Sequence, residues 1–254
     1  NDNTAIGFFA LNANTTGTQN VGVGVSALTA STTANYNVAM GWHAGKANTT
    51  GSHNTALGAN ALDANTTASY NIAVGSYALT NNTTGAKNTA VGYEALGANT
   101  TGHDVVAVGF ESLKSNTTGL YNTAVGFQAL ETVTTGERNT AVGRNALNAN
   151  TGSYNTAVGM NALETNSAGN RNTGIGCRAS VSNQSGDDNT AVGNDALFAN
   201  TGSDNTAVGS YALDANTTGS VNTAIGKDAL GANTTGVRNT AVGTNALDAN
   251  TTAD

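Results

Sequence analysis

A seventeen-residue period runs through the whole sequence. The unit Asn-x-Ala-Val-Gly begins at positions 3, 20, 37, 54, 71, 88, 105, 122, 139, 155, 172, 189, 205, 222 and 239, which makes fifteen copies. The copies follow one another every seventeen residues, except for two steps of sixteen, from 139 to 155 and from 189 to 205. Both short copies read "NTG" where most of the others read "NTTG". A deletion confined to one place indicates a loop.

The length of the unit decides the fold class. If the unit is numbered one to seventeen, place five is Gly in every copy and place nine is Leu except at Gly45 and Ser180. Seventeen residues cannot supply the two amphipathic helices of a helical repeat. They suffice for one coil of a β-solenoid, with two short strands, "TAVG" and "ALxAN", joined by two turns. The sequence therefore predicts an all-β fold, a parallel β-solenoid of about fifteen 17-residue coils, as a single continuous array over residues 1–254.

Alternation along a strand predicts which side chains point inward. In the second strand, place ten is polar, as at Lys114 and Glu131, so places nine and eleven face inward. In the first strand, place seven is mostly polar, so places three, five and seven point outward and places two and four point inward. The predicted core consists of the place-four residues Val74, Val91, Val108, Val125 and Val142 and the place-nine residues Leu79, Leu96, Leu113, Leu130 and Leu147. On this assignment Val125→Asp breaks the solenoid locally, because its carboxylate would be buried without a partner.

The turns and ladders form the other predicted structural positions. The turn glycines are Gly75, Gly92, Gly109, Gly126 and Gly143. Asn at a repeated corner tolerates left-handed backbone geometry and bonds its own turn, and stacked Asn side chains form amide ladders. The predicted Asn ladders comprise Asn71, Asn88, Asn122 and Asn139 at place one and Asn82, Asn99 and Asn116 at place twelve.

Two features of the array predict self-association. With places three and five outward, the first strand would present a smooth strip of Ala and Gly, which permits close approach of another chain. The array also carries no cap: its first copy starts at Asn3 and its last runs out at Asp254, one residue short of complete. Uncapped coils leave unpaired backbone groups that recruit further strands. We therefore expect a homo-oligomer, an end-to-end filament, or a window on a longer array.

Composition excludes several function classes. The net charge of −7, with 9 Lys and Arg against 16 Asp and Glu, opposes binding to nucleic acid. No apolar run approaches the ~18 residues of a spanning helix, so we expect no membrane insertion. The carboxylates Asp187, Asp188 and Asp204 have no partner His at a recurring place, and no metal-ligand cluster appears. We therefore expect no catalytic residues, no metal site, no cofactor and no enzymatic activity.

Two recurring Thr and Asn patterns suggest weaker alternatives. Columns of Thr suggest an ice-binding solenoid, but a flat two-rank surface needs Thr-x-Thr, and pairs such as Thr100 and Thr101 are adjacent and lie in a turn. Asn-x-Thr sequons recur at Asn14, Asn48, Asn65, Asn82, Asn99, Asn116, Asn216, Asn233 and Asn250. They would be glycosylation acceptors in a eukaryotic secretory pathway, and turn chemistry accounts for their regularity.

The segment "NTAVGYEAL", from Asn88 to Leu96, resembles the head repeats of trimeric autotransporter adhesins and related repeats of phage tail-fibre shafts. The resemblance extends through "NTAVGxxA" in every copy. It implies a left-handed parallel β-roll that trimerises, with Val91 inward and Asn88 and Gly92 at turns.

These observations favour a structural or adhesive extracellular fibre, at a cell or virion surface, with a phage tail-fibre shaft as the alternative. The partner we expect is a second copy of the chain, and a glycan or other surface ligand is left open. Aromatic residues at place six, Phe8, Trp42, Tyr93, Phe110 and Phe127, are the one hint of such a ligand.

Overall fold

The fold is described from a computed structural model that covers residues 2–253. It is all-β: no helix occurs among those residues. The chain divides into two compact units, Asn1–Val125 and Gly126–Asp254. Each unit is a parallel β-solenoid in which every coil contributes one three-residue strand. The prediction of a single continuous array over residues 1–254 stays a prediction, and Asp254, the end of its last copy, lies outside the described residues.

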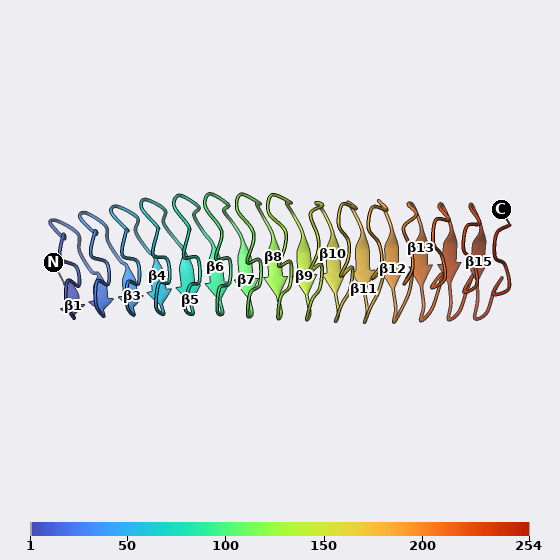
Figure 1. The fold of residues 1–254 in the computed structure, drawn as a ribbon, viewed down its shortest axis with the longest axis horizontal. Coiled ribbons are helices and arrows are strands. Elements are labelled where there is room, and N and C mark those ends of the chain that lie inside the picture. The colour runs from blue at the N-terminus through green and yellow to red at the C-terminus, as the bar shows by residue number, and fades with distance from the viewer. Residues whose placement is uncertain (1, 254) are drawn as a thin grey trace. The chain divides into compact units, whose positions relative to one another are not determined.

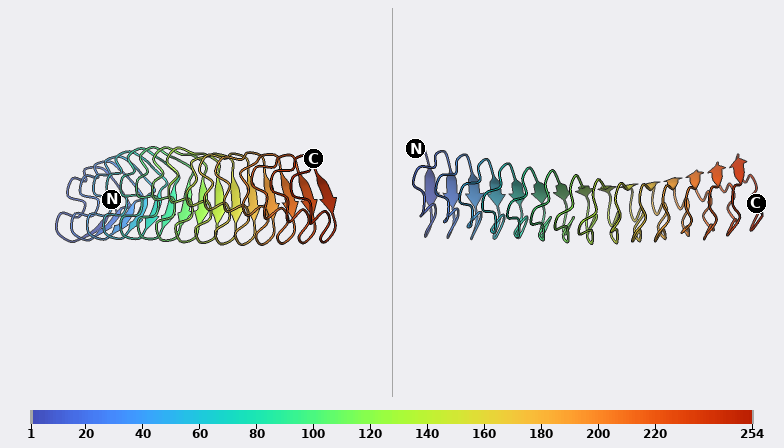
Figure 2. Two further views of the ribbon diagram at one scale, coloured as in Figure 1. Left: turned by 45° about the vertical axis from the view of Figure 1, so that its right-hand side comes forward. Right: turned by 90° about the horizontal axis from the view of Figure 1, so that it is seen from above.

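In both units the strands follow one another in chain order along one side of the coils (Figure 1). The first unit contains β1 (Thr4–Ile6), β2 (Val21–Val23), β3 (Val38–Met40), β4 (Thr55–Leu57), β5 (Ile72–Val74), β6 (Thr89–Val91), β7 (Val106–Val108) and β8 (Thr123–Val125). The second unit contains β9 (Thr140–Val142), β10 (Thr156–Val158), β11 (Thr173–Ile175), β12 (Thr190–Val192), β13 (Thr206–Val208), β14 (Thr223–Ile225) and β15 (Thr240–Val242). Two further views show the same stacking of coils within each unit (Figure 2).

Equal spacing of the copies puts equivalent residues opposite each other in the sheet. Within each unit, neighbouring strands pair in parallel and in register, as Thr89 pairs with Val106 and Thr173 with Thr190. The sixteen-residue steps keep this register, because Thr140 still pairs with Thr156. The missing residue shortens only the corner, where Asn150 Nδ2 donates to the Gly152 carbonyl two residues on instead of three. The prediction of a loop at "NTTG" is confirmed.

The predicted second strand is wrong, because the segment from place six to place eleven is a succession of turns. In the coil after β6, Glu94 and Leu96 have φ values of 50° and 55°, in the left-handed region. The intervening Ala95 does not, so the backbone reverses hand at each step. This alternation lets two consecutive residues, Ala95 and Leu96, both point inward and be buried. A strand would have sent one of them outward.

The facing predicted for the first strand is also wrong. From β2 to β15 the central residue of each strand, which is Ala except in β2 and β11, points inward and is buried, whereas the residues on either side of it face outward. Val125 and Val142 are 38% and 37% exposed, and the other three valines assigned to the core, Val74, Val91 and Val108, are only partly buried. The place-four valines therefore belong to the outer face of the sheet.

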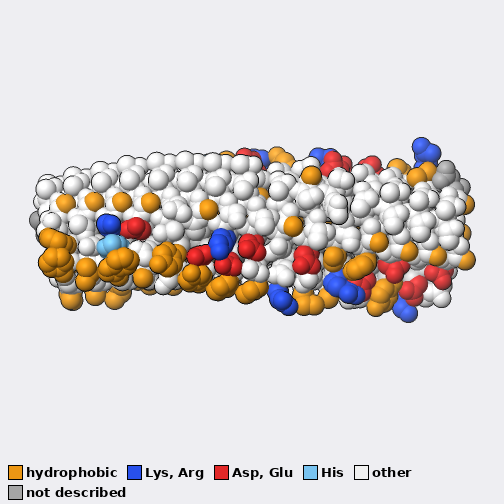
Figure 3. Space-filling model, in the orientation of Figure 1, with side chains coloured by type: hydrophobic (Ala, Val, Ile, Leu, Met, Phe, Trp, Pro, Cys, Tyr) orange, Lys and Arg blue, Asp and Glu red, His pale blue; other side chains and the backbone are white. Residues whose placement is uncertain are grey.

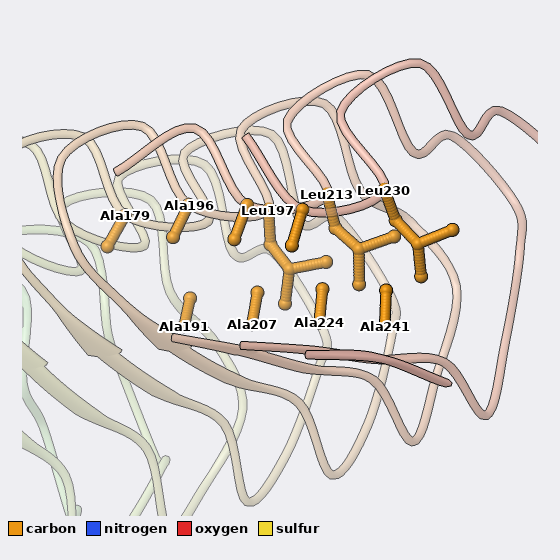
Figure 4. Close-up of a cluster of buried hydrophobic side chains, with 11 residues drawn as sticks. Ala179, Ala191, Ala196, Leu197, Ala207, Leu213, Ala224, Leu230 and Ala241 are labelled. Carbon is orange, nitrogen blue, oxygen red and sulfur yellow. The ribbon is translucent and has the colours of Figure 1, made fainter. Parts of the chain in front are cut away.

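The small distance between strand and turns explains why Ala occupies the inside. Where Gly174 replaces that Ala, an added methyl group would lie only 3.0 Å from Leu163 Cγ. The gap thus accepts one methyl group from the strand and one Leu from the turns, which leaves no room for Val. Leu79, Leu96, Leu113, Leu130 and Leu147 are fully buried, so this half of the predicted core is confirmed. Figure 4 shows Leu197, Leu213 and Leu230 reaching toward Ala207, Ala224 and Ala241.

Two independent reasons require glycine at the position after each strand. All five predicted turn glycines have positive φ, between 129° and 143°, which side chains rarely adopt. The glycines of adjacent coils also lie almost in contact: a Cβ on Gly92 would come within 2.3 Å of the Gly109 carbonyl oxygen. The prediction is confirmed for Gly75, Gly92, Gly109, Gly126 and Gly143.

Candidate functional site

The first asparagine column joins neighbouring coils just before each strand. Asn71, Asn88, Asn122 and Asn139 are all buried. The Asn88 backbone N–H donates to Asn71 Oδ1 at 2.9 Å, and Asn88 Nδ2 donates to the Gly102 carbonyl at 2.8 Å. In the second unit the Asn155 N–H donates to Asn139 Oδ1 at 2.9 Å. Each amide therefore links the adjacent coil to the next corner of its own coil.

The second asparagine column is an amide ladder on the other side of that corner. Asn116 Nδ2 donates to Asn99 Oδ1 at 3.0 Å, and Asn99 Nδ2 donates to Asn82 Oδ1 at 2.8 Å. Asn99 Nδ2 also donates to the Gly102 carbonyl at 3.0 Å, the same oxygen that Asn88 reaches. The two columns thus converge on one buried carbonyl per coil. Buried polar groups need partners, and these asparagines supply them.

The asparagines of most sequons are buried and have a structural role. Asn48, Asn65, Asn82, Asn99, Asn116, Asn216 and Asn233 lie inside the coils, each at 1% exposure or less. Their Nδ2 atoms, the atoms a glycan would modify, are engaged in the ladder and at the corner. In the folded chain these seven sequons serve the turn.

The outer face of the strands carries two parallel columns of side chains, at places two and four. In the second unit, place two is Thr in every strand, in register from Thr140 to Thr240. Place four is Val or Ile throughout that unit. In the first unit, place two is Thr in some strands and an apolar residue, such as Val38 or Ile72, in others. The sheet thus presents Thr and apolar methyl groups outward, in place of the Ala and Gly strip expected from the sequence.

Exposed aromatic rings concentrate in the first unit. Phe8 and Trp42 are 67% and 51% exposed, and Tyr93 and Phe110 are also exposed. Tyr93 stacks on Phe110 at 5.3 Å between ring centroids. Figure 3 shows hydrophobic side chains gathered along the lower edge of the N-terminal half. Such contiguous apolar surface marks an interaction site more often than isolated exposed residues do.

A second aromatic stack lies at place seventeen, where His53 stands between Tyr36 and Tyr70. The ring centroids are 4.8 and 4.9 Å apart, and the planes are within 22° of parallel. Because His53 is stacked between the two Tyr rings, both faces of its ring are covered and cannot contact another molecule.

Charged side chains of neighbouring coils meet on the surface. Lys114 Nζ lies 2.7 Å from Glu94 Oε2 and 2.8 Å from Glu111 Oε1. The hydrogen bonds that Lys114 donates to these two carboxylates, the one to Glu111 first, raise the pKa of Lys114. In the second unit Arg171 binds Asp188 across a coil at 2.7 Å, and this hydrogen bond lowers the pKa of Asp188. Sequence reasoning missed these pairs, although opposite charges three or seventeen residues apart could have indicated them.

The described residues contain neither a metal-binding constellation nor a spanning helix. No group of three His, Cys, Asp or Glu side chains in residues 2–253 is placed to hold a metal ion. Over the same range no helix is long and apolar enough to cross a membrane. Comparison of the chain with known protein families, with curated proteins and with solved structures finds no match. The features of the described residues that can contact another molecule are the exposed side chains on the surfaces of the solenoid.

Proposed function

We propose that the chain is a structural segment of an extracellular fibre that self-associates through the exposed apolar side chains of its first unit. The observation that carries the proposal is the exposed aromatic column at place six, with Trp42, Tyr93 and Phe110, beside an apolar strand face. Burying aromatic side chains of this kind is a main source of binding free energy at interfaces. The coil geometry supports a structural role, because each coil is tied to the next by backbone bonds and two asparagine columns.

A second copy of the chain is the partner that fits best. In both copies, equivalent side chains repeat along the solenoid every ~4.8 Å, once per coil. Contacts between the two copies can therefore repeat over many coils. A trimer at a cell surface is what the adhesin-like motif implies, and a phage tail-fibre shaft is the alternative. The motif "NTAVG" supports both, and a gene neighbourhood of secretion genes or of tail-assembly genes distinguishes them.

Sedimentation velocity of the chain tests self-association. We expect an oligomer for the unmodified chain and a monomer for the triple variant Trp42→Ser, Tyr93→Ser and Phe110→Ser. The matched control replaces the place-seventeen rings Tyr36, Tyr70 and Tyr121, which are equally exposed, and stays oligomeric. A monomeric unmodified chain, or loss of association in the control alone, contradicts the proposal.

A specific observation also supports ice binding as a second candidate. In the second unit the seven place-two residues are Thr, in register, with Val or Ile two residues further on the same face. Such ranks repeat every ~4.8 Å across the strands and every ~6.6 Å along them, a regular spacing that can organise water. Thermal hysteresis that disappears in Thr173→Lys and Thr206→Lys would support this candidate. Equal hysteresis in these variants would eliminate it.

A further inference from the structure

A hollow on the turn side of the second unit is lined by charged and aromatic side chains of the kind that bind small ligands. It has a volume of about 190 Å³ and is lined by Arg178, Asp195, Phe198, Tyr211 and Asp214. These residues occupy places seven and ten of three consecutive coils. Pockets for drug-sized ligands measure about 300–1,000 Å³, so this hollow admits a ligand of one ring.

The carboxylate of Asp195 lacks a full set of hydrogen bonds. Its side chain is 4% exposed. Oδ2 accepts from Arg178 Nη2 at 2.7 Å and from Asn194 Nδ2 at 2.6 Å, whereas Oδ1 is buried and has no partner. A buried oxygen without a donor is costly. A hydroxyl donor that enters the hollow, with a small shift of the half-exposed Arg178, would satisfy it.

The charges of the side chains that line the hollow limit the chemical class of ligand that it can bind. Two carboxylates, Asp195 and Asp214, disfavour an anion. Arg178 already neutralises Asp195 and disfavours a cation. A neutral polyhydroxy compound suits the two carboxylates and the guanidinium, since its hydroxyls donate to carboxylates and accept from a guanidinium. Tyr211 offers a ring for the C–H face of such a compound, while Phe198 is covered by the Arg178 guanidinium at 5.2 Å.

A hollow of similar composition lies in the first unit, at places seven, ten and eleven of three consecutive coils. A hollow of about 230 Å³ is lined by Tyr77, Thr80, Asn81, Glu94, Gly97, Ala98 and Lys114. It again combines an aromatic ring, a carboxylate and a cation. Tyr77 is held edge-on against Tyr93, with ring centroids 6.1 Å apart, and Lys114 is held by its two glutamates.

Glycine at place ten lines the first hollow and lies close to one carboxylate of the second. Place ten is Gly in two coils of the chain, at Gly97 and Gly231. Gly97 lines the first hollow. A Cβ on Gly231 would lie 3.6 Å from Asp214 Oδ1 and 2.8 Å from Asp248 Oδ1. Gly97 thus adds no side chain to the lining of the first hollow, and Gly231 adds none beside Asp214.

We propose that each hollow is a subsite for one pyranose ring of a neutral polysaccharide, with Tyr77 or Tyr211 as the stacking surface. Hydroxyls of the sugar bind the Arg178, Asp195 and Asp214 side chains in the second unit, and Asn81, Glu94 and Lys114 in the first. This inference goes beyond the fibre proposal, because it concerns side chains at places seven, ten and eleven and not the place-six rings. Two subsites on one chain raise the avidity for a repeating polymer.

Ligand-observed saturation-transfer NMR on the full chain tests the proposal. The probes are the methyl pyranosides of glucose, mannose and galactose and N-acetylglucosamine, with methylammonium chloride as the competing cation. We expect at least one sugar to bind with a dissociation constant of about 1 mM. Tyr211→Ala and Asp214→Asn should each remove one of two sites, and Tyr77→Ala with Tyr211→Ala should remove both, a loss of more than about tenfold in affinity.

Two controls make the outcome decisive. Tyr154→Ala removes an exposed ring outside both hollows and should bind like the unmodified chain. Tyr211→Phe keeps the stacking ring and should also bind. The proposal is overturned if no probe sugar binds, if the double variant binds unchanged, or if methylammonium binds and the sugars do not. Sedimentation of the same samples reports self-association separately, so failure of one proposal is not failure of the other.

Discussion

The two units have the same kind of interior and differ in their surfaces. Inside, both stack the same Ala and Leu columns: Ala90 and Leu96 in the first unit correspond to Ala207 and Leu213 in the second. Outside, place six carries Trp42 and Tyr93 in the first unit, but Asn194 and Lys227 in the second. Coil geometry restricts the inward columns to Ala and Leu with few exceptions, such as Gly174 and Ser180, whereas the outward places are free to vary. Differences in function between the units therefore belong to their outward side chains.

The largest effect should come from a charge in the interior. Ala124→Asp places a carboxylate where exposure is zero, without a partner, whereas the neighbouring Val125→Asp places it on a residue that is 38% exposed. We expect Ala124→Asp to lower the free energy of unfolding by more than about 4 kcal/mol and Val125→Asp by less than about 1 kcal/mol. Urea unfolding measures both. Equal losses of stability would mean that Val125 faces inward, as first expected from the sequence.

The turn glycines should give the next largest effect, equal in both units. Gly92→Ala and Gly209→Ala each put a Cβ within 2.4 Å of a backbone carbonyl oxygen, at φ values of 137° and 139°. We expect a loss of about 3–5 kcal/mol from each, because neither the strained backbone nor the adjacent coil can relax freely. Circular dichroism melts of the two variants check this. A mild effect in one unit would show that the interiors are not equivalent.

Leucine truncation should cost somewhat less and also match between units. Leu96→Ala and Leu213→Ala each open a cavity facing a strand Ala, and we expect a loss of about 2–5 kcal/mol for each. Chemical denaturation gives the two values. A difference of more than about 1 kcal/mol would mean that one unit collapses around the cavity and the other does not.

The smallest effect concerns pH and is expected from Asp214 in the second unit. Burial, followed by the charges of Asp228 and Asp195, raises the pKa of Asp214 above 3.8. The folded chain therefore binds this proton more tightly than the unfolded chain. Its contribution to stability is present below pH ~3.8 and is lost as pH rises through the raised pKa of the folded state. Asp214→Asn should remove this pH dependence, and unfolding at about pH 3.5 and about pH 7 compares the two proteins. An unchanged pH dependence in the variant would contradict the assignment.

Sequence reasoning obtained the period, the corner, the buried leucines, the turn glycines and the asparagine columns, because each is a residue type repeated at one place. It failed where the backbone departs from a strand. The segment containing Ala95 and Leu96 uses left-handed φ at Glu94 and Leu96, which non-glycine residues rarely adopt. Nothing in these side chains signals it. In the first strand, alternation was counted from place seven, which lies in the turns beyond the end of the real strand, so Val and Ala exchanged faces. The hollows depend on side chains from three coils and escaped a reading of single columns.

The coil-to-coil register has a genetic consequence. Within the first asparagine column, hydrogen bonds between coils join residues sixteen or seventeen positions apart, as between Asn71 and Asn88 or Asn139 and Asn155. A tandem duplication of one stretch of about 51 nucleotides of the gene, wherever it begins, would therefore add one coil whose neighbours already fit it. Recombination between copies can change the number of coils without disturbing any bond inside them. Within such a gene, the length of the solenoid can vary faster than its cross-section.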